Sequence, residues 1–367
     1  FLSTFRNPGS EYRGAPFWAW NGDLAPDELR RQIRVMHDMG LGGFFMHSRV
    51  GLATDYMSER WMECIGACID EAEKLTMRAW LYDEDRWPSG AAGGLVTKDP
   101  AYRQRALVLD ATRDARNFEW EEGTLAACVA RLDGTRADTV RPLKRGDAAP
   151  ECAEGEVVLR FTVRVDDSSS WFNGQTYLDT MNPDAVDRFL AVTHEAYRKR
   201  FGDDFGQAVP GVFTDEPHRG AFFSPMQSTS RGKTIPWTDR LPKVFRKRYG
   251  YDVLDHLVEL VYDVEGRPVT PARHDYHDCL TELYAGSFGQ RIDQWCNKHS
   301  LLYTGHVLHE ETLSTQTLVV GSAMRFYEHM QAPGMDLLTQ VRREYDTAKG
   351  VASAARQFGR TWRLTET

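Results

Sequence analysis

Residues 209–217 read Val-Pro-Gly-Val-Phe-Thr-Asp-Glu-Pro, and this stretch contains the pattern that decides the fold. Its short apolar run predicts a buried strand, and two acids and a proline follow where that strand ends. The same succession of a strand-sized apolar run, a polar end and an amphipathic helix recurs along most of the chain. This alternation is typical of parallel strands joined by helices, as in α/β proteins.

The predicted elements form a regular series. The strands are expected at 17–20, 43–47, 78–82, 209–214, 302–307, 334–338 and 362–366. The helices are expected at 26–39, 58–75, 182–199, 241–249, 276–299, 322–330 and 348–358, with Pro26 in a first turn and Ser58 and Asn182 as N-caps. The series predicts an α/β fold, a (β/α)8 TIM-like barrel that is incomplete at the C-terminus because the sequence stops after the seventh strand.

Residues 102–180 break this rhythm. The runs 105–109 and 157–165 alternate like strands of β hairpins, and the Gly- and Ala-rich sequence between them has no helical period. We therefore expect a β-rich subdomain inserted after strand three, on the side of the barrel where insertions collect. The predicted domains are 1–101 (first part of the barrel), 102–180 (inserted subdomain) and 181–367 (the barrel through strand seven).

Composition narrows the classes of protein. The 367 residues have a net charge of −8, whereas nucleic-acid-binding proteins usually present a basic face, so no nucleic-acid partner is expected. The longest apolar runs are strand-sized, so no membrane span is expected. The six cysteines lack zinc-site spacing, and Cys64 and Cys68 are predicted to be buried on one helix. We expect a soluble protein of unknown compartment and oligomeric state, secreted or periplasmic only if a signal peptide has been removed.

Polar residues, most of them acids, follow nearly every predicted strand. In a parallel barrel the carboxyl ends of the strands meet at one face, where active sites lie. A single acid is more simply explained as the cap of the following helix, but so many acids at one face favour a functional site. The residues at these ends are Asn21, His47, Asp83, Glu84, Asp215, Glu216, Glu310, Glu311, Asp336 and Glu366.

Glu216 is the sharpest candidate among these acids. Side chains alternate between the two faces of a strand, so Val212, Thr214 and Glu216 share one face. We assign that face to the barrel interior because its residues are small or β-branched. Phe213 and Asp215 then face the helices. Pro217 has no N–H group and fixes the exit from the strand. Glu216 is therefore predicted to point into the mouth of the barrel.

The predicted catalytic pair is Glu216 and Glu366. The alternation places Trp362, Leu364 and Glu366 on one face of the last strand, so Glu366 is also predicted to point into the mouth. Two facing carboxylates suit cleavage of a glycosidic bond. One is protonated and donates to the leaving oxygen, and the other is ionised and activates water or attacks the sugar. Neighbouring acids would raise the pKa of the proton donor.

Further side chains are predicted to hold a sugar. Aromatic rings at strand ends suit stacking on sugar C–H surfaces, and His47 and His306 suit hydrogen bonds to hydroxyls or to a carboxylate. A single aromatic or histidine in a strand is more often structural. The predicted substrate-binding residues are Trp18, Trp20, Asn21, His47, Asp83, Glu84, Trp87, Asp215, His306 and Glu310, and further aromatic candidates are Phe222, Phe223 and Trp237.

A metal site is a separate prediction. Asp83, Glu84, Asp85, Glu310 and Glu311 form an oxygen-rich set of the type that Ca²⁺ prefers. Glu310 and Glu311 are the predicted metal ligands. No EF-hand loop or other compact calcium motif is present in the sequence. Calcium is the one candidate cofactor, and no organic cofactor is expected.

Several motifs resemble, in the same order, those of glycoside hydrolase family 106, the α-L-rhamnosidases. The motifs are Pro16–Gly22, Gly42–His47, Leu81–Glu84 with Trp87–Gly90 and Gly93-Gly94, Phe213–Pro217, Gly305-His306 with Glu310, and Thr365–Thr367. The resemblance implies an α-L-rhamnosidase-like barrel, an inverting mechanism and a calcium ion that helps hold the sugar. It also implies Glu216 as general acid and Glu366 as general base. The Asp85-Arg86 pair departs from the family pattern.

The predicted function is cleavage of terminal α-L-rhamnosyl residues from polysaccharides or glycosides, with an oligosaccharide or polysaccharide as the partner. Two alternatives stay open. One is a barrel glycosidase of another sugar specificity, such as a β-galactosidase-like enzyme, and the other is a non-catalytic carbohydrate-binding barrel. A metal-dependent hydrolase of phosphate or amide bonds is disfavoured, because the sequence has neither a phosphate loop nor His-rich ligand spacing.

Overall fold

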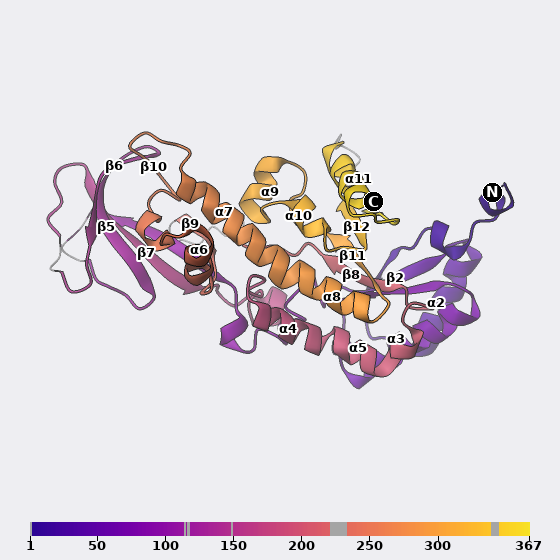
Figure 1. Cartoon of the computed structure of the whole chain (residues 1–367). Coiled ribbons are helices and arrows are strands. Elements are labelled where there is room, and N and C mark those ends of the chain that lie inside the picture. Colours follow the sequence, from indigo (N-terminus) through magenta and orange to yellow (C-terminus); the bar gives the residue numbers. More distant parts are fainter. Residues whose placement is uncertain (1, 114, 116–117, 148–149, 221–232, 339–344) are drawn as a thin grey trace.

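The computed structural model of the chain describes residues 2–113, 115, 118–147, 150–220, 233–338 and 345–367. Two sheets organise these residues and lie toward opposite ends of an elongated molecule (Figure 1). The parallel sheet lies at the end that holds both termini, and the mixed sheet lies at the other. A long helical run extends between the two ends, and it consists of α7 (Pro271–Tyr284), the π-helical turn Ala285–Gly289 and α8 (Gln290–Lys298).

The parallel sheet contains seven strands whose order in space follows the sequence. Every neighbouring pair is parallel, as the alternation of strands and helices predicts. The strands are β1 (Phe17–Trp20), β2 (Gly43–Ser48), β3 (Arg78–Tyr82), β8 (Gly211–Asp215), β11 (Leu302–His306), β12 (Ala332–Asp336) and β13 (Leu364–Glu366).

Helices connect these strands, and their caps explain where several of them begin. Pro26 occupies the first turn of its helix, the Ser58 side chain accepts from Trp61 N–H, and the Asn182 side chain accepts from Asp184 N–H. The helices are α1 (Leu2–Arg6), α2 (Pro26–Asp38), α3 (Glu59–Lys74), α4 (Pro183–Val192), α5 (His194–Phe201), α6 (Leu241–Tyr249), α9 (Leu313–Val319), α10 (Ala323–Tyr327) and α11 (Asp346–Gln357).

The sequence analysis also made predictions about membrane-spanning helices and about the cysteines. Among the described residues, none of the helices has both the length and the apolar character needed to cross a membrane. All six cysteines are free, and Cys64 and Cys68 are buried side by side on α3. The two residues are therefore core thiols, as their helical spacing predicts.

The interior face of the parallel sheet is aromatic. Phe45, Tyr82 and Phe213 form one buried cluster, with Phe17 and Leu364 packed against it. The rings meet mostly edge to face, with centroids 4.8 Å apart for the pair Phe17 and Phe213. The clustering of side chains from the first and last strands shows that the sheet curls around them.

The predicted facing of the strand before Glu216 is wrong. Val212 belongs to the large core cluster shared with the helices, whereas Phe213 lies in the interior cluster. Asp215 shares the face of Phe213, so its side chain is the one that alternation directs into the sheet interior. Both faces of a parallel strand are buried, so the apolar pattern does not reveal which face is inside.

The sheet is a curled parallel half-barrel. β1 and β13 are its outermost strands, and no pairing joins them among the described residues. Tyr12 and Trp362, which precede these two strands, nevertheless have ring centroids 5.5 Å apart. The described strands thus support a coarser description than the predicted (β/α)8 barrel, namely an α/β protein with a curled parallel sheet and a second, mixed sheet.

The second sheet has six strands and extends beyond residues 102–180. Its central strands are antiparallel, whereas β10 pairs with β6 in parallel. The later strands β9 and β10 join it from a part of the sequence in which no strand was predicted. The strands are β4 (Arg105–Thr112), β5 (Thr124–Asp133), β6 (Arg136–Leu143), β7 (Glu156–Val165), β9 (Lys233–Trp237) and β10 (Asp263–Val264).

Candidate active site

The carboxyl ends of four neighbouring strands bring acids and a histidine together. Asp215, the last residue of β8, lies opposite His306 in the register with β11. Asp336 lies opposite Glu366 in the register between β12 and β13. Because parallel strands end at one edge of the sheet, these residues converge although they are far apart in the sequence.

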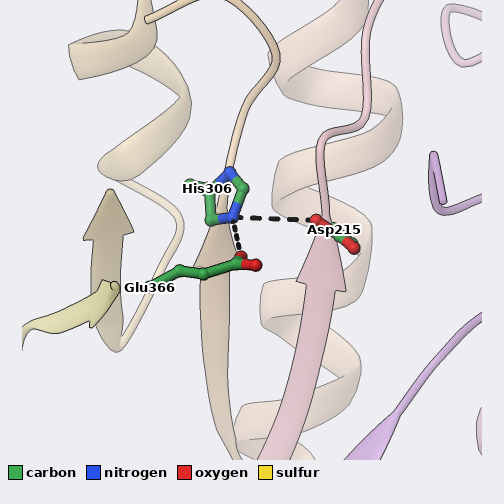
Figure 2. A group of neighbouring side chains, drawn as sticks. All are labelled: Asp215, His306 and Glu366. Atoms are coloured by element: carbon green, nitrogen blue, oxygen red, sulfur yellow. Dashed lines mark hydrogen bonds and ion pairs between the residues drawn. The ribbon is translucent and has the colours of Figure 1, made fainter. Parts of the chain in front are cut away.

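His306 lies between two carboxylates (Figure 2). Its Nε2 atom is 2.8 Å from Glu366 Oε2 and 3.6 Å from Asp215 Oδ1. The imidazole is completely buried, and the side chain of Glu366 is 16% exposed. The partly open carboxylate is therefore Glu366, whereas His306 and Asp215 support it from the protein side.

The histidine carries a positive charge at neutral pH. Burial lowers the pKa of His306, but the hydrogen bond to Glu366 and the charges of Glu310, Asp215 and Glu366 raise it more, to about 10. Nε2 therefore donates its proton to Glu366 in a charge-assisted hydrogen bond. Such a bond stabilises the negative charge of the carboxylate that accepts it.

Glu216 follows the last residue of β8 and leaves the strand. Its φ of 46° lies in the left-handed region, which a residue other than glycine rarely adopts, and its N–H donates to His306 O at 3.1 Å. Burial raises the pKa of Glu216 to about 8, helped by the charge of Asp215 and, less strongly, by those of Asp336 and Glu366. Glu216 is thus protonated at neutral pH, and the negative charge of Glu366 is one of those that raise its pKa.

Asp215 is held by residues that the sequence analysis did not select. Tyr82 OH donates to Asp215 Oδ2 at 2.6 Å, and Asp215 N–H donates to Ser89 Oγ at 2.8 Å. Ser89 N–H in turn donates to Asp215 O at 2.8 Å. The available signal was weak: Tyr82 is the polar last residue of a strand, and Ser89 lies in the motif around Trp87.

Trp18 and Trp20 do not belong to this site. They are 9% and 2% exposed, and Trp20 packs edge to face against Trp18 and Trp61 with centroids 5.4 and 5.1 Å apart. Trp61 lies on α3, so both indoles face the helix layer. The prediction that they stack on a sugar is wrong, because Phe17 and not its neighbours faces the interior of the sheet.

Asp83 and Glu84 are also structural. Asp83 is fully buried and accepts hydrogen bonds from the hydroxyls of Ser89 and Thr214. Glu84 is 1% exposed and accepts from the backbone N–H groups of the loop that follows it, at Asp85, Gly90, Ala92 and Gly93. Protein donors occupy these carboxylates and shape the loop, which disfavours their predicted contact with substrate.

His47 and Asn21 remain candidates for substrate binding, and they differ in exposure to solvent. His47 is 3% exposed and packs against Tyr82 with centroids 3.9 Å apart, and among the described residues its Nε2 has no hydrogen-bond partner. Burial, with a smaller effect of Arg49, lowers the pKa of His47 to about 3, so the ring is neutral. Asn21 is exposed just beyond the end of β1. Their predicted contacts with a sugar stay predictions.

Protein groups donate hydrogen bonds to both carboxylate oxygens of Glu310. It is 5% exposed, one carboxylate oxygen accepts from Tyr327 OH, and the other accepts from Asp336 N–H at 2.7 Å. Glu311 is a partly exposed neighbour that lies 3.6 Å from His309 Nδ1. Both carboxylate oxygens of Glu310 are thus already occupied, which disfavours its predicted roles in substrate and metal binding.

The group that the fold does gather does not fit calcium. Within the described ranges, Asp215, His306 and Glu366 each offer a ligand atom, and these atoms lie within 4.8 Å of one another. Ca²⁺ prefers six to eight oxygen ligands, whereas this group supplies two carboxylates and an imidazole that is protonated at neutral pH. Two carboxylates and one imidazole fall short of the oxygen ligands that Ca²⁺ prefers, so we derive no catalytic step through an ion here.

The other aromatic candidates separate into three cases. Trp237 is 1% exposed and belongs to the hydrophobic core. Phe222 and Phe223 lie outside the described residues. Trp87 is partly exposed in the loop after β3, where its ring meets that of Trp171 at 5.7 Å. Among the aromatic candidates that the structure describes, only Trp87, with its unpredicted partner Trp171, offers a partly open indole near the strand ends.

Comparisons with known proteins give a likeness in fold. No protein-family profile matches the sequence, and no curated protein matches it either. Among solved structures, the chain is similar to a rhamnosidase from Novosphingobium sp. PP1Y, with a TM-score of 0.65 and 15% sequence identity. The match covers 100% of this chain and 52% of that one, so this chain spans about half the length of the rhamnosidase. The chain has the fold of that part of a rhamnosidase.

Proposed function

We propose that this chain is the catalytic part of a glycoside hydrolase that removes terminal α-L-rhamnosyl residues from oligosaccharides, polysaccharides or other glycosides. The fold shared with a rhamnosidase supports the class of enzyme, and the motifs that resemble glycoside hydrolase family 106 support the sugar. One observation carries the proposal. Burial and nearby negative charges, that of Glu366 among them, raise the pKa of Glu216 to about 8, and Glu366 accepts a hydrogen bond from a histidine cation.

In this proposal Glu216 is the general acid. A glycosidic oxygen leaves as an alcohol only if it receives a proton while the bond to the sugar breaks. Glu216 holds that proton at neutral pH because burial and the nearby negative charge of Asp215 raise its pKa. Its exit from the strand at a positive φ separates it from Asp215, which keeps its own contacts with Tyr82 and His306.

Glu366 is the general base. It accepts the hydrogen bond of His306, so its charge is stabilised and one of its oxygens is fixed in direction. The side chain is partly exposed, so a water molecule can reach the carboxylate. Glu366 removes a proton from that water as the oxygen attacks the anomeric carbon from the side opposite the leaving group, which inverts the configuration. The inverting outcome rests on the family resemblance.

A panel of aryl glycosides tests the proposal, with and without a chelator. We expect release from the aryl α-L-rhamnoside and from none of the β-galactoside, β-glucuronide and α-L-fucoside controls. Loss of release with chelator would add a calcium site that the described residues do not reveal. Cleavage of another glycoside alone would contradict the sugar assignment, and binding of rhamnose without turnover of any substrate would indicate a carbohydrate-binding barrel instead.

The configuration of the first product tests the mechanism separately. Proton NMR during hydrolysis of an α-L-rhamnoside distinguishes the two anomers before they equilibrate. We expect β-L-rhamnose first, because inversion places the water on the face opposite the aglycone. Initial α-L-rhamnose would show retention, and would assign the second carboxylate the role of a nucleophile rather than a base.

A further inference from the structure

Two segments far apart in the sequence meet beside Glu216. Ser89, in the loop after β3, exchanges hydrogen bonds with the backbone of Asp215, the residue before Glu216. Tyr177 OH donates to Ser89 O at 2.7 Å, which joins the segment after β7 to the same loop. Trp87 is two residues before Ser89, and consecutive Cα atoms are about 3.8 Å apart, so its Cα lies within roughly 17 Å of that of Glu216.

Trp87, in the loop after β3, and Trp171, in the segment after β7, form an aromatic pair. Their ring centroids are 5.7 Å apart at an interplanar angle of 65°, and Trp171 Nε1 donates to Trp87 O at 2.6 Å. Both residues are partly exposed. Because the indole N–H of Trp171 is already used, its ring is held in one orientation and offers apolar surface rather than a donor.

The pair differs from the tryptophans that pack between the parallel sheet and its helices. Trp18, Trp20 and Trp61 belong to the hydrophobic core, whereas Trp87 and Trp171 belong to none of the hydrophobic clusters of the described residues. The two large apolar side chains therefore lie outside the hydrophobic core of the described residues. Partly exposed tryptophans outside a core are typical of binding surfaces.

Charged residues fix the pair to the strand ends. The Arg86 guanidinium lies 5.8 Å from the centroid of Trp171 and pairs with Asp85 Oδ2 at 3.0 Å. Asp85 Oδ1 accepts from Ser48 Oγ, on the last residue of β2, at 2.9 Å. Asn173 Nδ2 donates to Asp85 Oδ2 at 3.1 Å. The indoles are therefore braced against the sheet, as a preorganised subsite requires.

We propose that Trp87 and Trp171 form the subsite for a leaving-group sugar, the ring that follows the scissile bond. This inference rests on the proposed function. The general acid protonates the glycosidic oxygen, and that oxygen remains with the leaving group, so the leaving group lies on the side of Glu216. The loop that carries Trp87 is attached on that side, because Ser89 exchanges hydrogen bonds with Asp215, the residue before Glu216. Indole faces stack on the flat C–H face of a pyranose.

Two substrates that share the rhamnosyl unit test the subsite. Methyl α-L-rhamnoside has no second ring, whereas an α-L-rhamnosyl-glucose disaccharide places a pyranose in the leaving-group position. In Trp171→Ala and Trp87→Ala we expect the ratio of kcat/KM for the disaccharide to that for the methyl glycoside to fall about tenfold, from the loss of an aromatic contact. Trp171→Phe keeps an aromatic face and should keep most of this ratio even if the alanine variants fold poorly.

Trp362→Ala is the matched control. Trp362 is 36% exposed and precedes β13, so it lies at the opposite end of the strands from the mouth. Its variant should leave the substrate ratio unchanged. An equal fall for both substrates, or no fall in either tryptophan variant, would overturn the subsite.

The subsite and the proposed function fail in different ways. If the protein cleaves neither substrate, the proposed function fails, and the subsite is then tested by binding alone. Quenching of tryptophan fluorescence by the disaccharide gives its Kd for the protein and for Trp171→Phe and Trp87→Ala. Weaker binding to Trp87→Ala than to Trp171→Phe supports the subsite, whereas equal affinity of all three proteins overturns it.

Discussion

His306 Nε2 lies 2.8 Å from Glu366 Oε2, although the two residues are 60 positions apart in the chain. The contact joins β11 to β13 across the intervening strand β12. His306 is completely buried and Glu366 is partly exposed, so the pair has an inner, charged member and an outer member that solvent reaches. A base that must be ionised and aimed at a water molecule needs such support.

His306→Gln should lower kcat more than it raises KM. The variant removes the cation and its charge-assisted hydrogen bond, which is worth roughly 1.5–3 kcal/mol, so kcat should fall about 10- to 100-fold. KM for the rhamnoside should change little, because the His306 ring is completely buried. Steady-state kinetics measure both constants, and His274→Gln, whose side chain is 75% exposed, is the control.

The opposite result would return His306 to its predicted role in substrate binding. A rise in KM with an unchanged kcat would show that the imidazole contributes to holding the sugar.

The pH dependence of kcat/KM should show an alkaline limb near pH 8. A general acid works only when protonated, and the pKa of Glu216 is raised to about 8. Activity should therefore be retained as the pH rises through the ordinary carboxyl range and fall about tenfold for each unit above pH 8. A pH–rate profile between pH 5 and 10 checks this. A limb centred below pH 6 would mean that another group supplies the proton.

Ser89→Ala should destabilise the protein and slow catalysis together. The hydroxyl donates to Asp83 and accepts from Asp215 N–H, and both partners are buried. Two buried groups lose a partner, so the free energy of unfolding should fall by roughly 2 kcal/mol. Urea unfolding measures this fall. Ser168→Ala changes an exposed serine and should leave stability within about 0.5 kcal/mol of the wild type.

Trp20→Phe tests whether Trp20 packs in the hydrophobic core or contacts the sugar, as the sequence analysis predicted. The ring is 2% exposed between Trp18 and Trp61, so the smaller side chain should lower the free energy of unfolding by roughly 1–3 kcal/mol. KM for the rhamnoside should stay the same within error. An increased KM with unchanged stability would instead place Trp20 in the site.

The sequence predicts the strands of the parallel sheet well and their facing poorly. Each predicted strand matches an observed one to within a few residues, because apolar runs bounded by helix signals are a strong local pattern. The facing depends on which apolar side chains fit the inside of the curl, and Phe213 and Val212 are both apolar. Strand β9 was missed because its pairing with β4 joins residues more than a hundred positions apart.

The sequence could predict that the acids converge, but it could not predict the role of each acid in the site. Parallel strands place their ends at one edge, so Asp215, His306 and Glu366 had to approach one another. His306 and Asp215 are buried and support Glu366, whereas Glu84 accepts hydrogen bonds from loop N–H groups. These roles depend on packing between residues several strands apart. Such long-range contacts leave no periodic signal in a single sequence.

The most direct test compares turnover of one α-L-rhamnoside by the wild type, Glu216→Gln and Glu366→Gln. Each glutamine keeps the shape of the side chain but can neither donate a proton as an acid nor accept one as a base. Both variants should lose at least about a thousandfold in kcat while still binding rhamnose, as expected for the loss of a general acid or base. Wild-type turnover in either variant would contradict the account, because the reaction would then proceed without one of the two carboxyl groups.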